Sequence, residues 1–363
     1  MKKTFAAFAL CLTPLFAHAD EALVARPEVK EYLAETAQDY GFDEADLVNL
    51  FTRVEPKPNI LAIFDRPSTG RPWYAFHTDF VNASRINSGA AFWREHEKDL
   101  AEISQAYQVD PAVIVAILDV ETLFGKNTGS FRVLDVLATA AFDYPRRADF
   151  FRKELTEFLL LARGEKEDPL SFKGSYAGAM GWPQFMPSSF RAFAVDWNND
   201  GHHDIWNTPV DAMASVASYL ALHGWQMGGD SMVPVNVSGD QIDDLIADKF
   251  NLHYSVAELI AKGVIPPPEL ETTQPAVLYP LEVSPGEIKY FLGFKNFYAI
   301  TRYNKSTLYA TAVLELADAI REAKSHPPVV ETAKPAKSAT ATKHRKPAKP
   351  AKRAKTTTKK KHA

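Results

Sequence analysis

Apolar residues recur every three or four positions over most of the chain up to about residue 227, which is the spacing of a helix with one buried face. The pattern predicts helices over 92–107, 148–163, 211–223 and 306–324. Between 231 and 290 the pattern changes: SMVPVNVSG and QPAVLYPLEV predict short strands, and VIPPPELETTQP predicts an extended connector. The sequence therefore predicts a mainly α (α+β) protein with a small β insertion before its last helix.

A carboxylate interrupts the apolar face of one further helix, in PAVIVAILDVETLFG. An Asp-Pro pair at 110–111 predicts where this helix begins, and Gly125 predicts where it ends. Ile114, Ile117 and Glu121 lie three and four positions apart, so they share one face. The spacing places Glu121 about one turn before the end of the helix, in line with its apolar residues.

Burial of Glu121 would raise the pKa of its carboxyl group, because an apolar environment disfavours the charged form. A carboxylic acid that is still protonated near neutral pH is what a general acid requires. The spacing alone also allows a second interpretation, in which Glu121 points to solvent at a frayed helix end.

The first residues have the composition of a secretion signal. Lys2 and Lys3 precede an apolar run over 5–16, and the small residues AHA at 17–19 form a cleavage site. Cys11, the only cysteine, lies inside this signal, and Leu10 precedes it where a lipoprotein signal has a small residue. We therefore expect a disulfide-free, soluble periplasmic protein without a lipid anchor.

The last residues differ in composition from the rest. Residues 331–363 contain 12 Lys or Arg and one acidic residue, a net charge of +11; since the whole chain has −4, residues 1–330 have −15. Without aromatic residues this tail cannot form a core, and we expect disorder over 326–363. It is either an electrostatic tether to an anionic surface of the cell envelope or a solvated spacer. The export signal and the acidic remainder argue against nucleic acid as a partner.

The segment DWNNDGHHDIWN, residues 196–207, has the spacing of an EF-hand calcium loop, with Gly201 at the sharp turn. Asn207 stands where that pattern has a bidentate Glu, so a later carboxylate is needed to complete the site. The alternative is a surface turn rich in Asp and Asn that binds no metal. The expected ligands of a structural Ca²⁺ are Asp196, Asn198, Asp200, His202 through its backbone carbonyl, and Asp211.

Between the helix of Glu121 and this loop lies GSYAGAMGWPQFMPSSF, residues 174–190. Its small residues allow a ligand to approach the backbone closely, Ser175 and Gln184 offer hydrogen bonds, and Phe185 offers an apolar face. This combination suits a sugar ring; the alternative is a tightly packed contact between a helix and a loop.

Five motifs in order resemble the lytic murein transglycosylase B family: VETLFG, ATAAFDYPRRADFF, GSYAGAMGWPQFMPSS, DWNNDGHHDIWN and NFYAITRYNKSTLYA. The similarity runs from about Trp73 to Ile320. It implies a lysozyme-like catalytic core with an additional α domain and a small β domain. It also implies cleavage of the MurNAc–GlcNAc bond of peptidoglycan without the addition of water.

The resemblance further implies a role for each matching residue. Glu121 is the expected catalytic acid and base, and the calcium loop is expected to bind its ion with the ligands named above. No organic cofactor is expected. The expected partner is a glycan strand of peptidoglycan, and the protein is expected to be a monomer. The expected substrate-binding residues are Ser175, Gln184, Phe185, Arg146, Arg147, Tyr74, Tyr219, Tyr303, Asn304 and Tyr309.

The sequence and the resemblance together predict how the chain is divided. The predicted segments are a signal peptide (1–19), an N-terminal α region (20–105), a lysozyme-like core (106–230) with its EF-hand-like loop (196–211), a β insertion (231–300), a groove strand or loop with the C-terminal helix (301–325), and a basic tail (326–363).

Most glycosidases use two carboxylates. Asp119 points to another helix face than Glu121, and no spacing places Asp135 or Asp143 opposite it. This favours a mechanism in which Glu121 acts alone. Two alternatives remain open: a hydrolytic muramidase, which would need a second carboxylate, and a peptidoglycan-binding protein without catalytic activity.

Overall fold

The structure is a computed structural model that describes residues 22–65 and 70–326. The signal peptide expected over 1–19 lies outside the described residues, as does all of the expected tail after residue 326. Within the described part, no single helix is both long and apolar enough to cross a membrane. The helices α6 (Glu97–Tyr107) and α7 (Pro111–Thr122) pass that test only as a pair bent by 111°.

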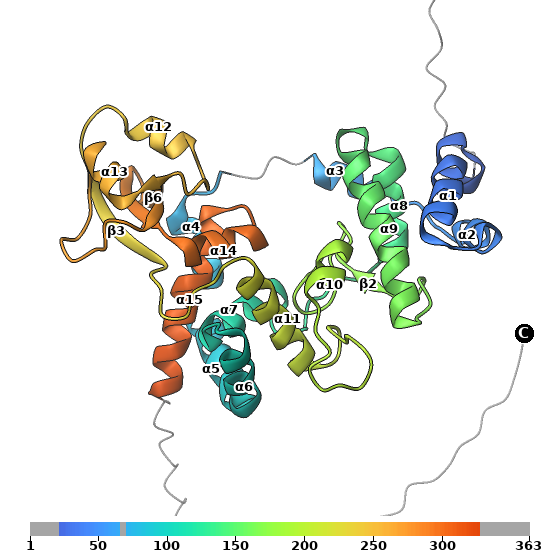
Figure 1. The fold of residues 1–363 in the computed structure, drawn as a ribbon, viewed down its shortest axis with the longest axis horizontal. Coiled ribbons are helices and arrows are strands. Elements are labelled where there is room, and N and C mark those ends of the chain that lie inside the picture. The colour runs from blue at the N-terminus through green and yellow to red at the C-terminus, as the bar shows by residue number, and fades with distance from the viewer. Residues whose placement is uncertain (1–21, 66–69, 327–363) are drawn as a thin grey trace, which may run out of the picture. The chain divides into compact units, whose positions relative to one another are not determined.

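The first helices of the chain pack against a group of helices that follows much later (Figure 1). Phe51 and Leu33 from the early group and Phe151 and Phe158 from the later one are buried in a shared hydrophobic core. The early group is η1 (Leu23–Ala25), α1 (Pro27–Tyr40), α2 (Glu44–Phe51), η2 (Pro58–Ile60) and α3 (Leu61–Phe64). The later group is α8 (Val133–Asp143), η3 (Pro145–Arg147), α9 (Ala148–Glu165) and α10 (Pro187–Phe193).

A second core is formed around the helix that carries Glu121, which is α7 (Pro111–Thr122). The helices predicted over 148–163, 211–223 and 306–324 are confirmed as α9, α11 (Pro209–Leu222) and α15 (Thr307–Ser325). The single helix predicted over 92–107 is wrong, because the chain leaves helical geometry at His96 (φ −108°, ψ 25°). The helices around α7 are α4 (Trp73–Phe80), α5 (Ala83–Glu95), α6 (Glu97–Tyr107), α11 (Pro209–Leu222), α14 (Lys295–Tyr303) and α15 (Thr307–Ser325).

The β insertion is a five-stranded antiparallel sheet in the order β4-β6-β7-β3-β5. The strands predicted at both ends of the insertion are confirmed as β3 and β6, and β6 forms a hairpin with β7 through Gly286 (φ 77°). The sheet has a core of its own. Its elements are β3 (Met232–Val237), α12 (Ile242–Ala247), β4 (Tyr254–Ser255), α13 (Val256–Ala261), β5 (Val264–Ile265), β6 (Pro275–Ser284) and β7 (Glu287–Gly293).

Two boundaries differ from the expected ones. The segment 20–105 is shared between two cores, since α1 to α3 join one and α4 to α6 join the other. The groove strand or loop expected from 301 onward is helical as far as Tyr303, because Thr301 and Ala299 are buried on the inner face of α14. A two-stranded antiparallel pair, β1 (Phe131–Arg132) and β2 (Lys173–Gly174), adjoins the site described next.

Candidate active site

Glu121 lies in the last turn of helix α7, most of which is buried. The Asp110 side chain accepts a hydrogen bond from the backbone N–H of Ala112 (2.9 Å), which caps the helix start as predicted. The helix ends at Thr122, before the expected Gly125, because three consecutive residues are left-handed: Leu123 (φ 52°), Phe124 (φ 57°) and Gly125 (φ 79°). Only the last of them is glycine, so the turn is strained and must be held by its surroundings.

The Thr122 side chain is part of what holds this turn. Its hydroxyl donates to the Trp182 carbonyl (3.0 Å) and accepts from the Gly125 N–H (3.0 Å). Phe124 stacks on Phe92 with ring centroids 4.4 Å apart. These contacts fix the helix end directly after Glu121. Thr122 was not among the expected site residues; the signal in the sequence was a hydroxyl residue next to the glutamate at a helix end.

The Glu121 carboxyl group is partly buried, and its Oε1 accepts a hydrogen bond from the Tyr309 hydroxyl of α15 at 2.5 Å. Burial raises the pKa of Glu121 from 4.5 to about 7, and the hydrogen bond from Tyr309 opposes part of this rise. No hydrogen bond to Oε2 is present in residues 22–65 and 70–326. One oxygen is therefore held by the protein, and the other is available for a proton.

Three tyrosines gather on the same side of Glu121. Tyr219 donates to the Arg302 carbonyl (2.7 Å) and Tyr303 to the Pro183 carbonyl (2.6 Å), while Tyr309 donates to Glu121. Burial raises the pKa of Tyr219 to about 12 and the pKa values of Tyr303 and Tyr309 further, so all three remain neutral donors. The charge of Glu121 adds to the rise at Tyr303 and Tyr309.

The loop of residues 174–184 provides two of the expected polar groups. The Ser175 hydroxyl accepts from the N–H groups of Ala177 (3.3 Å) and Ala179 (3.1 Å), which leaves its own proton free to donate. Gln184 has a left-handed backbone (φ 54°), and its amide nitrogen donates to the Gly181 carbonyl (2.9 Å). Its amide oxygen remains available as an acceptor.

The other expected substrate-binding residues lie at different depths. Phe185 is 2% exposed and packs against the rings of both Tyr219 and Tyr303, with centroids 5.7 and 5.9 Å away, so it supports these tyrosines from the core. Tyr74 and Asn304 are exposed.

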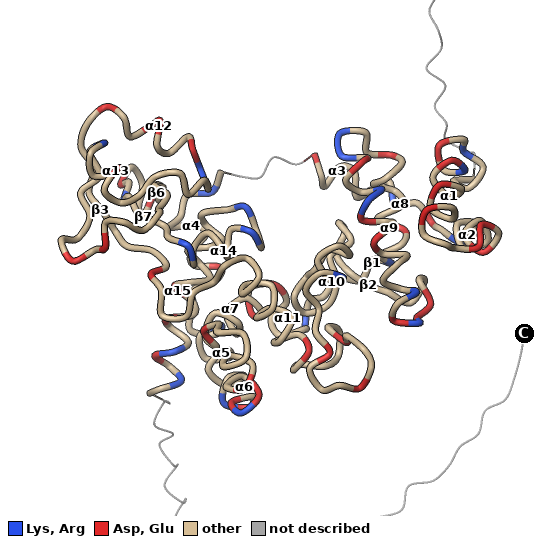
Figure 2. The backbone as a smooth tube through the Cα atoms, in the orientation of Figure 1, with Lys and Arg blue, Asp and Glu red and all other residues tan. Residues whose placement is uncertain are grey.

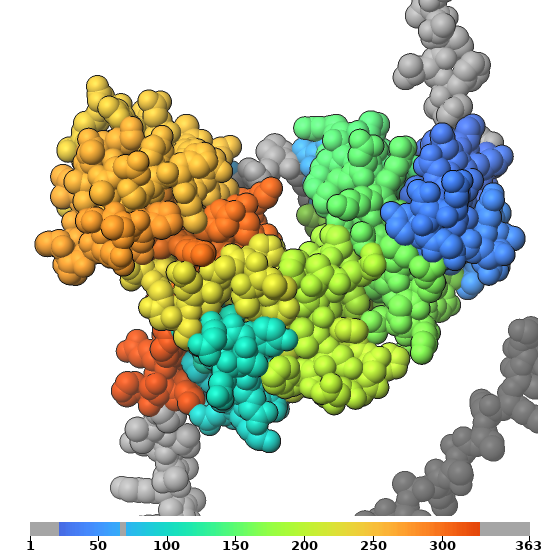
Figure 3. All heavy atoms as spheres, viewed as in Figure 1, coloured from blue at the N-terminus to red at the C-terminus, as the bar shows by residue number. Residues whose placement is uncertain are grey.

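The two arginines expected at the border of the groove lie on the surface. Arg146 pairs with Asp65 (3.2 Å), and Arg147 lies over the Phe150 ring at 4.2 Å. Neither contacts Glu121 in the part of the chain that the structure describes. Figure 3 shows the surface hollowed between the orange-red segment that includes α14 and the green segment of α8 and α9.

None of the three other carboxylates considered above lies beside Glu121. Asp119 is fully buried and paired with Arg85, and the Ser88 hydroxyl donates to it. Asp135 pairs with Arg132 (2.7 Å). Asp143 pairs with an arginine of the first helical group (2.7 Å). Each of these carboxylates has a cationic partner.

The expected calcium loop folds as a tight turn around its own side chains. Asp196 accepts from the backbone N–H groups of Asp200 (3.1 Å) and Gly201 (2.8 Å), and Asp200 accepts from that of His202 (2.9 Å). Among residues 22–65 and 70–326, no three His, Cys, Asp or Glu side chains are arranged as a metal site.

The chemistry of this loop nevertheless fits a hard cation. Gly201 is left-handed (φ 95°) with open space around it, as the turn of such a loop requires. Asp211 is fully buried, and its carboxylate accepts from the N–H groups of Trp197 (2.9 Å) and Asp204 (3.1 Å) without a cationic side chain beside it in the described chain. Burial and the nearby Asp196 raise the pKa of Asp211. A bound cation would therefore stabilise the charged form of this carboxyl group.

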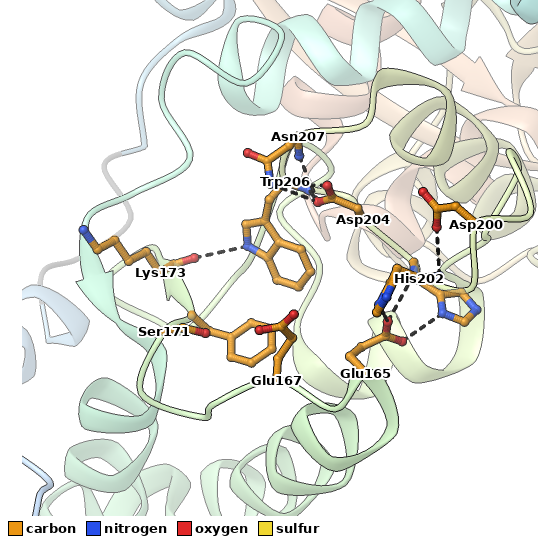
Figure 4. A pocket seen from close by; sticks show the side chains of 11 residues that line it. Glu165, Glu167, Ser171, Lys173, Asp200, His202, Asp204, Trp206 and Asn207 are labelled. Atoms are coloured by element: carbon orange, nitrogen blue, oxygen red, sulfur yellow. Dashed lines mark hydrogen bonds and ion pairs between the residues drawn. The ribbon is translucent and has the colours of Figure 1, made fainter.

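A pocket of about 540 Å³ lies beside this loop (Figure 4). The Glu165 carboxylate, from the end of α9, accepts from the backbone N–H of His203 (3.1 Å) and contacts its Nδ1 (2.8 Å). The indole of Trp206 donates to the Lys173 carbonyl (3.4 Å). These contacts anchor the loop to α9 and to β2.

A lone, partly buried glutamate at the end of a buried helix, beside a small antiparallel β pair and a row of tyrosines, defines a lysozyme-like enzyme that cleaves glycosidic bonds. Comparison with known proteins makes this specific. The sequence model of the family described as "Transglycosylase SLT domain" matches residues 25–318. The membrane-bound lytic murein transglycosylase B of Escherichia coli (strain K12) is 39% identical over 304 residues, which are 81% of this chain and 82% of that protein. The chain belongs to the lytic murein transglycosylase B family and is a lytic transglycosylase.

Solved structures agree with this assignment. The soluble lytic transglycosylase SltB1 from Pseudomonas aeruginosa is 45% identical, with a TM-score of 0.78 over 82% of this chain and 100% of that one. The Escherichia coli lytic transglycosylase Slt35 in complex with calcium is 39% identical, with a TM-score of 0.74 over 82% of this chain and 94% of that one. The expectation of a lysozyme-like α+β fold is confirmed.

Proposed function

We propose that the chain cleaves the MurNAc-β-1,4-GlcNAc bond of peptidoglycan and leaves a 1,6-anhydroMurNAc end, with Glu121 as its single acid and base. The observation that carries this proposal is the geometry of Glu121: one oxygen bound by Tyr309, the other free, and a pKa of about 7. A group that must first give and then take a proton works best when its pKa is close to the working pH.

In the first step, protonated Glu121 donates its proton to the glycosidic oxygen while the bond from that oxygen to C1 of MurNAc breaks. GlcNAc leaves with the proton, and the carbonyl oxygen of the substrate's own N-acetyl group stabilises the positive charge at C1. Asp119, Asp135 and Asp143 are held in ion pairs, which favours the acetamido group of the substrate as the source of this stabilisation.

In the second step, the Glu121 carboxylate takes the proton of the C6 hydroxyl group of the same sugar, and O6 forms a bond to C1. The acid is regenerated and no water is consumed. Tyr309 holds the carboxyl group in place through both steps, because its raised pKa keeps it a hydrogen-bond donor throughout.

Substrate binding is assigned to the residues around this group. Ser175 can donate to a sugar oxygen and Gln184 can accept from a sugar hydroxyl, because these are the hydrogen-bonding groups that their own loop leaves free. The remaining residues proposed to border the groove are Tyr74, Arg146, Arg147, Tyr219, Tyr303, Asn304 and Tyr309, with Phe185 as support.

A structural Ca²⁺ is proposed for the loop of residues 196–211. Asp196, Asn198, Asp200, the carbonyl of His202 and the buried Asp211 would hold it, and the ion would neutralise their clustered charge. The calcium in the structure of Slt35 supports this proposal by similarity. The ion has no part in the proton transfers above.

A periplasmic location is proposed from the export signal, with the soluble form favoured by the residue before Cys11. The basic tail is proposed as a tether to an anionic surface of the cell envelope.

The test is digestion of purified peptidoglycan with the mature protein and with its Glu121→Gln variant, with products identified by mass spectrometry. Products lighter by one water than those of hydrolysis, and absent with the variant, support the proposal. Products that contain the added water would identify a muramidase. Retention on the wall without any product would identify a binding protein.

A further inference from the structure

Trp182 lies between the helix that carries Glu121 and the loop that joins α10 to α11. Its carbonyl accepts the hydrogen bond of the Thr122 hydroxyl (3.0 Å). Its indole ring lies against Gly125, where an added Cβ would be 2.1 Å from the indole nitrogen. Thr122 and Gly125 stand at the two ends of the left-handed turn that terminates α7. Trp182 therefore contacts this turn with both its backbone and its side chain.

Trp182 is also bound to the loop between α10 and α11. Its backbone N–H donates to the Ile205 carbonyl (2.9 Å), and its indole N–H donates to the Trp206 carbonyl (2.8 Å). The close approach depends on Gly181, where an added Cβ would lie 2.7 Å from the Ile205 carbonyl oxygen. Two hydrogen bonds to consecutive carbonyls fix the position and the plane of the indole. We call the contacts of Trp182 with the helix end and with this loop the Trp182 bridge.

Asp204 orders the residues whose carbonyls Trp182 binds. Its Oδ1 accepts from the backbone N–H groups of Trp206 (3.0 Å) and Asn207 (3.0 Å), as Figure 4 shows. Its own N–H donates to the buried carboxylate of Asp211 (3.1 Å). Acidic residues recur along this loop, where Figure 2 marks them in red. The conformation of the loop therefore decides where the Trp182 bridge is attached.

The turn that the Trp182 bridge holds comes directly after Glu121. Phe92 stacks on Phe124, the middle residue of this turn, with ring centroids 4.4 Å apart, and lies 6.3 Å from the ring of Trp182. Three consecutive left-handed residues stay in place only when their surroundings hold them. A movement of Trp182 would therefore change the turn and, with it, the position of the Glu121 carboxyl group.

We propose that Trp182 is a positioning residue for Glu121, which it holds in place by joining the end of α7 to the turn that Asp204 orders. This inference rests on the proposed function and adds to it a residue that acts on the carboxyl group only through Thr122 and Gly125. Loss of the Trp182 bridge would admit water to Glu121. Since burial is what raises the pKa of Glu121, that pKa would then fall.

The first test is Trp182→Phe, which keeps an aromatic ring but removes the indole N–H. We expect kcat on soluble peptidoglycan strands to fall about tenfold, because a misplaced acid slows the chemical step. KM should stay within about twofold of its original value, since substrate binding is not affected. The alkaline side of the pH profile of kcat should move to lower pH by about half a unit, a shift that a general loss of stability would not cause.

Substitutions of Thr122 test the same bridge from its other end. Thr122→Val removes the hydroxyl that binds the Trp182 carbonyl and should lower kcat by a similar factor, whereas Thr122→Ser keeps a hydroxyl and should restore most of the rate. Trp182→Phe/Thr122→Val should lose little more than either single variant, because both substitutions break one bridge. The control is Trp93→Phe, at a partly buried tryptophan whose ring faces Lys324 at 5.5 Å, which should leave kcat and its pH profile unchanged.

A raised KM with an unchanged kcat would overturn the inference, because Trp182 would then be a contact of the sugar. An unmoved pH profile, or losses that add in the double variant, would also overturn it. The pKa of Glu121 can be measured without turnover by NMR titration of ¹³C-labelled glutamate carboxyl groups, with Glu121→Gln identifying the signal. If the intact enzyme releases no anhydro products, the proposed reaction fails, while this titration still decides whether Trp182 positions the carboxyl group.

Discussion

Tyr309 on α15 donates a hydrogen bond of 2.5 Å to Glu121 on α7, and 188 positions of sequence separate the two residues. The bond fixes one carboxyl oxygen and stabilises the charged form of the group. It thereby lowers a pKa that burial alone would raise further. The position and the acidity of the proposed catalytic group thus depend on the same contact.

Tyr309→Phe should slow the reaction and move its pH dependence. The rate should fall about tenfold, the equivalent of one hydrogen bond of about 1.4 kcal/mol. Because the lost bond favoured the carboxylate, the pKa of Glu121 should rise, and the loss of rate on the alkaline side should occur at higher pH. A pH–rate profile measures both effects, and a shift to lower pH would contradict the assignment.

Glu121→Gln should stabilise the folded protein above neutral pH. The pKa of Glu121 rises from 4.5 to about 7 on folding, so ionisation in the unfolded chain destabilises the native state progressively between these values. The variant should gain about 3 kcal/mol at pH 8 and almost nothing at pH 4. Urea unfolding at the two pH values tests this, and an equal gain at both would show that the carboxyl charge is not the cause.

Arg85→Gln should destabilise the protein strongly. Asp119 is fully buried, and its carboxylate depends on Arg85, which also donates to the Asp119 carbonyl (3.0 Å) near the end of α7. Removing one partner leaves a buried charge, with an expected loss of about 3 kcal/mol. The double variant Arg85→Gln/Asp119→Asn should recover part of this loss in urea unfolding. No recovery would mean that Arg85 acts through packing.

Calcium should raise the melting temperature, and a chelator should lower it. Binding to the native state alone stabilises it by about 2.7 kcal/mol when the free ion is at 100 times its dissociation constant. Asp196→Ala should abolish the response, because Asp196 is the first ligand of the proposed site. Mg²⁺ serves as the control cation. If Ca²⁺ does not change the melting temperature of the unsubstituted protein, the loop is a surface turn that does not bind calcium.

Gly125→Ala should weaken both stability and activity. Gly125 has φ +79°, and an added Cβ would lie 2.1 Å from the indole nitrogen of Trp182. The expected loss is about 2 kcal/mol. Gly164→Ala is the matched control, since Gly164 lies within α9 with no atom within 4 Å of the added group. Equal effects of the two substitutions would exclude a special role for the left-handed turn.

Patterns of neighbouring residues correctly predicted those parts of the fold that depend on short-range interactions, such as helix caps and single strands. The start of α7 at Asp110 and the strands β3 and β6 were predicted correctly. The break between α5 and α6 was not, because apolar spacing continues in register through His96, from Phe92 to Leu100. The spacing of apolar residues indicates which face of a helix is buried, but it does not indicate where the helix axis changes direction.

The site was predictable only in part for a similar reason. The position of Glu121 on its helix indicated burial, yet its contact with Tyr309 depends on tertiary packing that spacing along the chain does not encode. Phe185 was expected to line the groove and is buried under the tyrosines instead. The sequence does not distinguish an apolar side chain that faces a ligand from one that faces the core, because the neighbouring residues are the same in both cases.

Tyr303 packs against the cores of both helical groups. A glycan strand that lies across this tyrosine contacts a surface that exists only while both cores are folded. Bound substrate should therefore suppress partial unfolding of each core, and amide hydrogen exchange in α9 and in α15 should slow together. The two helical groups would then unfold as one cooperative unit whenever the enzyme is at work on a strand.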